Sequence, residues 1–206
     1  MKILVIPDIH LKPWIFDRAE EKMRAKYMQI TLRDMTKEDI EDYVRWFTEE
    51  TTWMKTDAPW EFAEADPTTA EAERSSWTEY YEEMRDRPAD APRWKFEIEA
   101  DGRHVGWVSC YDDLEYVPNP EEIPTVGIDI PDVSVWGRGV ATTALRMYLD
   151  YLKNRGHTCA YTQTWSGNHA MLRVAEKLGF TEYFRKKNHR TVNGESYDAV
   201  TLKIEL

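Results

Sequence analysis

The sequence predicts an α/β fold in which a mixed, mostly antiparallel central sheet is flanked by helices. Two dipeptides, Asp101-Gly102 and Asn193-Gly194, each separate two runs of alternating apolar and polar residues, which is typical of β-hairpins. A third observation is the stretch 135–143, where an extended segment passes through two glycines into an amphipathic helical pattern. Hairpins and a strand-to-helix junction in one chain favour a sheet with helices packed against it.

The composition predicts one packed domain. The chain has 206 residues, of which 42% are hydrophobic, and it contains nine tryptophans. Its net charge of −11, without a basic stripe, argues against a nucleic-acid partner. Eleven acidic residues and three arginines lie within 57–90. This acidic region would attract a polycationic substrate, or it is the solvated face of a helix; the sequence leaves both interpretations open.

The cysteines and the hydropathy pattern predict a cytoplasmic protein. Cys110 and Cys159 lie in strand-like runs and match no metal-ligand spacing, so we expect reduced thiols. No apolar run reaches the length needed to cross a bilayer, and we therefore expect no membrane association.

Residues 1–26 are predicted to form an N-terminal extension to a domain spanning 27–206. Asp8-Ile9-His10 follows a short apolar run and resembles the first metal motif of binuclear metallophosphoesterases. That family continues with a Gly-Asp-x-x-Asp segment, and the chain contains no Gly-Asp pair. A metal site needs its complete ligand set. We therefore expect no metal centre, and a phosphoesterase remains only a rival hypothesis.

The elements before the first hairpin begin with a strand over 28–33. Thr36 to Asp39 is similar to a capping box and predicts a helix start. Asp66 and Pro67 predict the N-cap and first residue of a second helix. The positions expected to face the core on these two helices are Ile40, Tyr43, Val44, Phe47, Trp77, Tyr81 and Met84.

The remaining elements alternate between strands and helices. Gly156 and Gly179 follow two amphipathic patterns and predict their helix ends. The strands are expected at 93–100, 103–111, 125–131, 158–164, 181–190 and 196–206, a loop at 117–124, and the helices from the glycine stretch to about 154 and over 168–178.

The glycine stretch predicts an anion site. Gly137 and Gly139 allow a sharp turn and close approach of a ligand to backbone amides, and the following helix offers its unpaired N–H groups. A phosphate or pyrophosphate is the natural occupant. A dinucleotide motif would need a third glycine where Thr142 stands, and a P-loop would need Gly-Lys-Ser or Gly-Lys-Thr, which the chain lacks.

Two motifs together resemble the GNAT superfamily of acyl-CoA-dependent N-acyltransferases. Residues 136–141, Trp-Gly-Arg-Gly-Val-Ala, are similar to the family's Gln/Arg-x-x-Gly-x-Gly/Ala motif. Tryptophan at the first position is a common variant in the branch that includes ribosomal-protein N-terminal acetyltransferases. Residues 168–180 resemble the family's asparagine-led helix that ends in Leu-Gly-Phe. The resemblance covers residues 28–206.

This resemblance implies acetyl-CoA as cosubstrate, without a metal. Amides of the glycine stretch would hold the pyrophosphate, and the pantothenate arm would pair with the strand that ends at Ile130, which splays from the strand at 158–164. Asn168 would bond the CoA arm, although it also suits a helix N-cap. The residues that the resemblance assigns to the cofactor are Ile130, Trp136, Gly137, Arg138, Gly139, Val140, Ala141, Thr142 and Asn168.

Asp129 is the candidate base. Gly127-Ile128-Asp129 resembles a segment of aminoglycoside 6'-N-acetyltransferases in which the aspartate is proposed to deprotonate the amine. The alternative is a strand carboxylate that faces solvent or pairs with a neighbour. Many family members place a tyrosine general acid where this chain has Ala175. The acid is then Ser166 or Tyr197, or the thiolate leaves unassisted.

The preferred acceptor is a small cationic amine such as an aminoglycoside or a polyamine, because of Asp129 and the acidic region. A protein N-terminus is the second hypothesis. The alternative hypothesis that involves no enzyme activity is a module that binds CoA without turning it over. Homodimers are common in the family, so a homodimer is one expected assembly.

Overall fold

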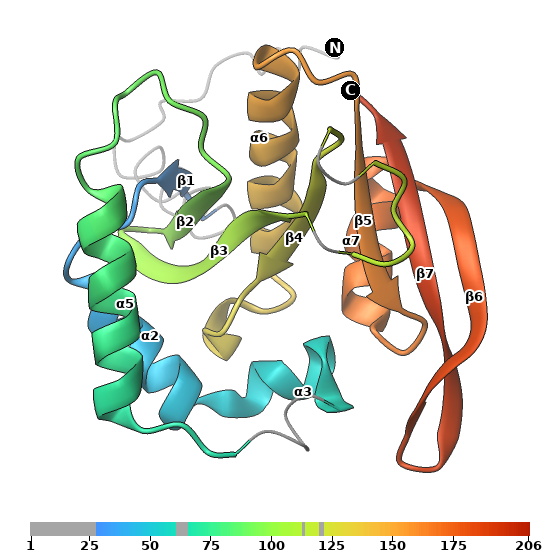
Figure 1. The fold of residues 1–206 in the computed structure, drawn as a ribbon, viewed down its shortest axis with the longest axis horizontal. Coiled ribbons are helices and arrows are strands. Elements are labelled where there is room, and N and C mark those ends of the chain that lie inside the picture. Colours follow the sequence, from blue (N-terminus) through green and yellow to red (C-terminus); the bar gives the residue numbers. More distant parts are fainter. Residues whose placement is uncertain (1–27, 61–65, 113, 120–121) are drawn as a thin grey trace, which may run out of the picture.

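The computed structural model describes residues 28–60, 66–112, 114–119 and 122–206 (Figure 1). The proposed N-terminal extension, with Asp8 and His10, lies outside the described residues. None of the helices described is both long and apolar enough to cross a membrane.

Seven strands form one sheet in the order β1-β2-β3-β4-β5-β7-β6. All neighbouring strands are antiparallel except β4 and β5, which are parallel. The predicted mixed, mostly antiparallel sheet is therefore confirmed. The strands are β1 Ile30–Arg33, β2 Lys95–Ala100, β3 Arg103–Tyr111, β4 Thr125–Asp129, β5 Cys159–Trp165, β6 Thr181–Val192 and β7 Glu195–Glu205.

Both predicted hairpins are present. Asp101 and Gly102 have φ values of 50° and 77°, and Asn193 and Gly194 have 50° and 82°. Positive φ at both central residues matches the right-handed twist of the flanking strands. These turns join β2 to β3 and β6 to β7.

The helices flank the sheet, and one predicted helix start is wrong. The second long helix begins at Ala70, not after Asp66, because Thr69 adopts an extended conformation and its Oγ1 accepts the amide of Ala72 at 3.2 Å. The capping interaction at Asp39 is half formed, since its carboxylate accepts the Thr36 amide at 2.7 Å. The helical segments are α2 Asp39–Thr48, η1 Thr51–Trp53, α3 Met54–Asp57, α5 Ala70–Met84, η2 Val133–Val135, α6 Val140–Asn154 and α7 His169–Leu178.

The two faces of the sheet are covered by different elements. On one face, Ile98, Val108 and Val126 pack in an apolar core that includes residues of α6 and α7. Their strand neighbours point to the opposite face, because successive side chains alternate. There, Trp107 packs with Tyr43 of α2 and other aromatic residues.

The parallel strands β4 and β5 separate near the middle of the sheet. Their only paired residues among those described are Thr125 and Tyr161. Beyond this pair the strands diverge toward their carboxyl ends (Figure 1). The predicted splay is therefore present, and it leaves Asp129, the last residue of β4, without a strand neighbour on the β5 side.

Candidate active site

The glycine stretch turns the chain from η2 into α6. Gly137 and Gly139 have φ values of 73° and 85°, a conformation that disfavours other residues. A Cβ at either position would meet no heavy atom within 4 Å. The turn therefore presents bare backbone next to open space, immediately before the first helical residue, Val140.

Two other glycines near the site have the opposite reason to lack a side chain. A Cβ at Gly127 would lie 2.4 Å from the ring of Tyr111. A Cβ at Gly167 would lie 1.9 Å from the ring of Trp165. These two positions make room for the protein's own aromatic rings, whereas Gly137 and Gly139 lie beside open space.

A cavity of about 320 Å³ lies where the glycine stretch, the end of β4, α7 and the η1–α3 segment meet. Its lining brings together the candidate base Asp129 and nearly all of the predicted cofactor residues. Arg138 is the exception: it is exposed and does not line the cavity. The predicted residues on the lining are Asp129, Ile130, Trp136, Gly137, Gly139, Val140, Ala141, Thr142 and Asn168.

Asn168 is the N-cap of the asparagine-led helix, as one of the two predicted roles requires. Its Oδ1 accepts the amide of Met171 at 3.0 Å, so it caps α7. It also lies on the cavity lining. Because Oδ1 serves the helix, Nδ2 is the group that it can offer to a ligand as a donor.

The two hydroxyls considered as general acids are not brought to the cavity. The Ser166 Oγ accepts the amide of Asp198 at 3.0 Å. The Tyr197 hydroxyl donates to Glu195 at 2.8 Å. Neither residue lines the cavity. Sequence reasoning identified their chemistry, but their neighbours in β7 direct both hydroxyls to other partners.

Asp129 is buried at the edge of the cavity, with 9% of its surface exposed. It lies opposite Trp107 in the β3–β4 register. Burial raises the pKa of its carboxyl well above the ordinary value, and the Asp57 carboxylate raises it further. The Lys95 ammonium and hydrogen bonding with Trp107 and Tyr111 act in the opposite direction. The expectation of a solvent-facing carboxylate therefore does not describe this residue.

Sequence reasoning missed several residues on the lining. Trp53, Thr56 and Asp57 reach the cavity from the η1–α3 segment. Arg173 and Lys177 reach it from one side of α7. Their spacing of four residues within the asparagine-led helix was a usable signal for these two cations, since it places them on one helix face. No local signal could have brought the η1–α3 segment to this place.

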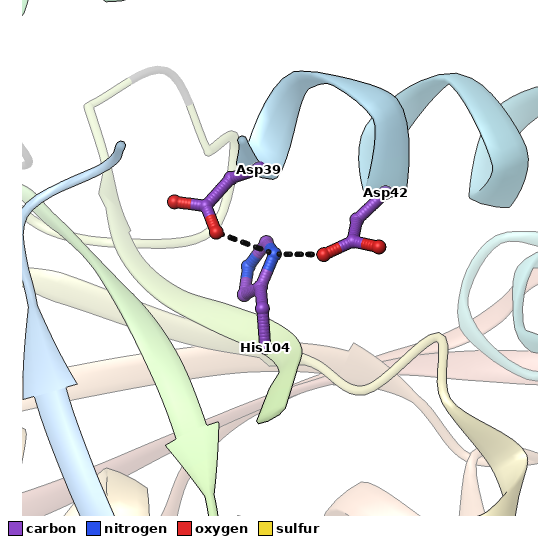
Figure 2. Close-up of side chains that lie close together, drawn as sticks. All are labelled: Asp39, Asp42 and His104. Atoms are coloured by element: carbon purple, nitrogen blue, oxygen red, sulfur yellow. Dashed lines mark hydrogen bonds and ion pairs between the residues drawn. The ribbon is translucent and has the colours of Figure 1, made fainter. Parts of the chain in front are cut away.

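A second group of charged side chains joins α2 to the sheet (Figure 2). The Nδ1 of His104 lies 3.0 Å from Asp42 and 3.2 Å from Asp39. Its Nε2 lies 2.9 Å from Glu97. Burial lowers the pKa of His104, but hydrogen bonds and charge attraction from these carboxylates outweigh it and raise the pKa to about 8. The ring is therefore an imidazolium at neutral pH.

Asp39, Asp42 and His104 have the spacing of metal ligands, but their other partners favour an ion-pair network. Arg33 donates to both oxygens of Asp39, at 2.6 and 2.8 Å. Arg45 lies 2.8 Å from Asp42. Cations already compensate both carboxylates, so a divalent ion would have to displace them. This network anchors the start of α2 and lies outside the cavity lining.

Comparison with known proteins agrees with this architecture. The family described as acetyltransferase (GNAT) domain matches residues 29–181. A search of curated protein sequences finds no significant match. One similar solved structure is RimL, the ribosomal L7/L12 alpha-N-protein acetyltransferase, in complex with coenzyme A; it is 15% identical over 86% of this chain and 94% of that chain, with a TM-score of 0.64. A second is yncA from Salmonella typhimurium with its cofactor acetyl-CoA, 18% identical over 86% of this chain and 94% of that chain, with a TM-score of 0.61. A third is an N-acetyltransferase from Staphylococcus aureus Mu50, 17% identical over 86% of this chain and 98% of that chain, with a TM-score of 0.62.

Proposed function

Because the chain belongs to the GNAT family of acetyltransferases, which use acetyl-CoA as cosubstrate, we propose that it transfers the acetyl group to the primary amine of a small cationic acceptor. The observation that carries this proposal is the cavity. It joins the bare glycine backbone at one end to the buried carboxylate of Asp129 at the other. One end suits an anion and the other suits a cation.

The cofactor end has three features that favour phosphate. The turn at Gly137 and Gly139 exposes amides, and α6 begins there with its unpaired N–H groups and positive dipole end. Arg173 and Lys177 of α7, which also line the cavity, add two positive charges. We assign this end to the pyrophosphate of CoA. Asn168 is assigned to the pantothenate arm through its Nδ2.

The acceptor end combines negative charge with an aromatic wall. Asp57 and Asp129 both line the cavity, and the Asp57 carboxylate disfavours ionisation of Asp129. Trp53 lies beside them. A bound ammonium ion relieves repulsion between two carboxylates and packs well against an indole. These contacts support a cationic amine over a neutral one.

The proposed reaction begins with loss of a proton from the acceptor. An alkylammonium has a pKa of about 10, so it must be deprotonated before it attacks. Asp129 accepts that proton, and its raised pKa makes it a stronger base than an exposed aspartate. The amine nitrogen forms a bond to the thioester carbon, and the C–S bond breaks. The CoA thiolate takes up the second nitrogen proton, and the first leaves to solvent.

No hydroxyl is needed to protonate the leaving group in this scheme. A thiol has a pKa of about 8.5, so its thiolate is stable enough to leave without an acid. Ala175, at the position where many family members have tyrosine, is fully buried and offers no proton. Ser166 and Tyr197 have no part in the proposed step because their hydroxyls lie off the cavity.

The second candidate acceptor is a protein N-terminus. One structure similar to this chain is the ribosomal L7/L12 alpha-N-protein acetyltransferase RimL. An α-amino group has a pKa of about 8 and needs less help from a base than a lysine-like amine. The buried Asp129 therefore favours the more basic acceptor.

The test is a thiol-release assay with acetyl-CoA against polyamines, aminoglycosides and peptides with free N-termini. We expect turnover with the cationic small amines and saturation by acetyl-CoA. Turnover of peptides alone would replace the acceptor with a protein N-terminus. Tight binding of acetyl-CoA without thiol release from any amine would instead indicate a non-catalytic CoA-binding module.

A further inference from the structure

Strand β2 buries two opposite charges on the face that α2 and α5 cover. The side chains of Lys95 and Glu97 are 14% and 1% exposed, and Nζ lies 3.4 Å from Oε1. Glu97 also accepts the Tyr43 hydroxyl at 2.6 Å and lies 2.9 Å from Nε2 of His104. Its charge is thus shared among three partners, and Lys95 is the most distant of them.

The ammonium of Lys95 is enclosed by aromatic rings. Its Nζ lies 4.4 Å from the ring centres of Tyr43 and Trp77, 4.9 Å from that of Tyr80, and 5.3 Å from that of Trp107. Nζ is buried, and its nearest charged partner among the described residues is Oε1 of Glu97 at 3.4 Å. Glu97 also interacts with Tyr43 and His104, so it compensates the ammonium only in part, and the aromatic rings exclude the water that would screen it.

The register of β2, β3 and β4 places Lys95 on the same face of the sheet as Asp129, at the end of β4. Glu97 pairs with Trp107, and Trp107 pairs with Asp129, so all three lie in one row on the same face. Lys95 precedes Glu97 by two residues and shares that face. Two strand spacings separate β2 from β4, about 10 Å between backbones. Trp107 stands on the strand between them, with its ring centre 5.3 Å from Nζ of Lys95.

Lys95 lowers the pKa of Asp129, as does hydrogen bonding with Trp107 and Tyr111, whereas burial and the Asp57 carboxylate raise it. The groups facing Lys95 itself are the carboxylates of Glu97, Asp129 and Asp39. Burial lowers the pKa of Lys95 below its ordinary value, and the attraction of these carboxylates offsets this effect only in part.

We propose that Lys95 is a positioning residue for the acetyl transfer: its buried ammonium, held in the aromatic cage, opposes protonation of Asp129 and so favours the ionised form that can accept the proton of the acceptor amine. This role rests on the proposed function. Lys95 does not line the cavity and touches no substrate. It acts through the charge state of Asp129, and it is one of the charged groups that link the α2 network to the acceptor end.

The direct test is the pH dependence of kcat/KM in the variant Lys95→Met, which keeps the apolar stem and removes the charge. Without the cation, Asp129 binds its proton at higher pH. The acidic limb of the profile should move up by on the order of one pH unit, while the plateau at high pH stays within about threefold of wild type. Lys95→Arg retains the charge and should restore the wild-type limb. Lys153→Met, on the exposed side of α6, is the matched control.

A second measurement needs no acceptor and does not depend on turnover. Carbon-detected NMR titration of the Asp129 carboxyl, with Asp129→Asn for assignment, compares wild type with Lys95→Met directly. Nitrogen NMR of the wild-type protein reports whether Lys95 is an ammonium at pH 7. A neutral Lys95, or an unchanged Asp129 titration in Lys95→Met, overturns the inference even if the enzyme turns over amines.

The two proposals fail in different ways. If Lys95 controls the Asp129 titration but Asp129→Asn retains full activity, the proposed base is wrong and the electrostatic coupling stands. If Asp129→Asn is inactive and the acidic limb does not move in Lys95→Met, the base stands and the role of Lys95 is wrong.

Discussion

The two faces of the central sheet are built from different chemistry. The face toward α6 buries apolar side chains such as Val108, which packs in one cluster with Leu145. The face toward α2 and α5 buries Lys95, Glu97 and Asp129 among aromatic rings. Apolar burial stabilises a fold by about 25 cal/mol per Å², whereas buried charges cost free energy even when they are paired. The difference suggests that the first face supplies stability and the second holds charges for chemistry.

The cavity draws on both sides of this division. The part proposed to bind the cofactor is lined by residues of α6, α7 and the turn that precedes α6. Its acceptor end receives Trp53 and Asp57 from the segment that follows α2. Donor and acceptor would therefore bind to parts of the molecule with different energetic roles, and variants on each side should separate binding, catalysis and stability.

The largest effect is expected at Asp129. Asp129→Asn keeps the shape of the side chain but removes the proposed base, and general-base catalysis typically contributes about 100- to 10,000-fold. We expect kcat/KM to fall within that range, while the midpoint of urea unfolding does not decrease, because a buried carboxylate is replaced by a neutral amide. Asp150→Asn, on the exposed side of α6, is the control. A variant that loses stability in parallel with activity would contradict the division between the faces.

The next effect concerns the apolar face. Leu145 is fully buried in α6, and Leu145→Ala should lower the free energy of unfolding by about 2–5 kcal/mol. At low temperature, where the variant remains folded, its kcat should stay within about twofold of wild type. Val133→Ala, at a 51% exposed position, should change the free energy of unfolding by less than about 0.5 kcal/mol. A large loss of kcat in folded Leu145→Ala would show that the apolar face also shapes the chemistry.

The charged face should make the free energy of unfolding depend on pH. The folded-state pKa of His104, about 8, lies above its ordinary value of 6.5. Its stabilising contribution is therefore complete below about pH 6.5 and is lost as the pH rises through about 8, an effect of about 2 kcal/mol. Urea unfolding at pH 6 and pH 9 measures it, with His104→Gln expected to lack this dependence. His157→Gln should retain it, and equal pH profiles for wild type and His104→Gln would rule out the assignment.

The smallest effect is expected at the cofactor end. Arg173 is exposed on the cavity lining, and Arg173→Gln should raise the KM for acetyl-CoA about threefold at low salt. The difference should fade as ionic strength increases, because an exposed charge is screened. Arg146→Gln on α6, away from the lining, should leave this KM unchanged. A salt-independent effect would contradict a direct role in phosphate binding.

Sequence reasoning succeeded where a few adjacent residues determine the geometry. The hairpins at Asp101-Gly102 and Asn193-Gly194 and the helix end at Gly179 depend on positive φ values that few residues adopt. The glycine stretch and the asparagine-led helix are similarly local. Their meeting in one cavity follows from the order of elements in the GNAT fold.

It failed where competing local signals or distant contacts decide. Asp66-Pro67 is a good helix start by composition, but Thr69 caps the helix three residues later. Lys95 and Glu97 fit the polar positions of an alternating strand, which usually face solvent. They are buried because α2 and α5 cover that face, a consequence of tertiary packing that no neighbouring residue indicates.

The two edge strands of the described sheet affect how readily the protein aggregates. β6 is a twelve-residue strand at one margin of the described sheet, and it carries Arg185, Lys186, Lys187 and Arg190. β1, at the other margin, has only four residues. An exposed edge strand can pair with a strand of another molecule and so start aggregation, unless the edge strand is short or charged. Each margin here has one of these two protections, so sheet-to-sheet polymerisation is discouraged at both.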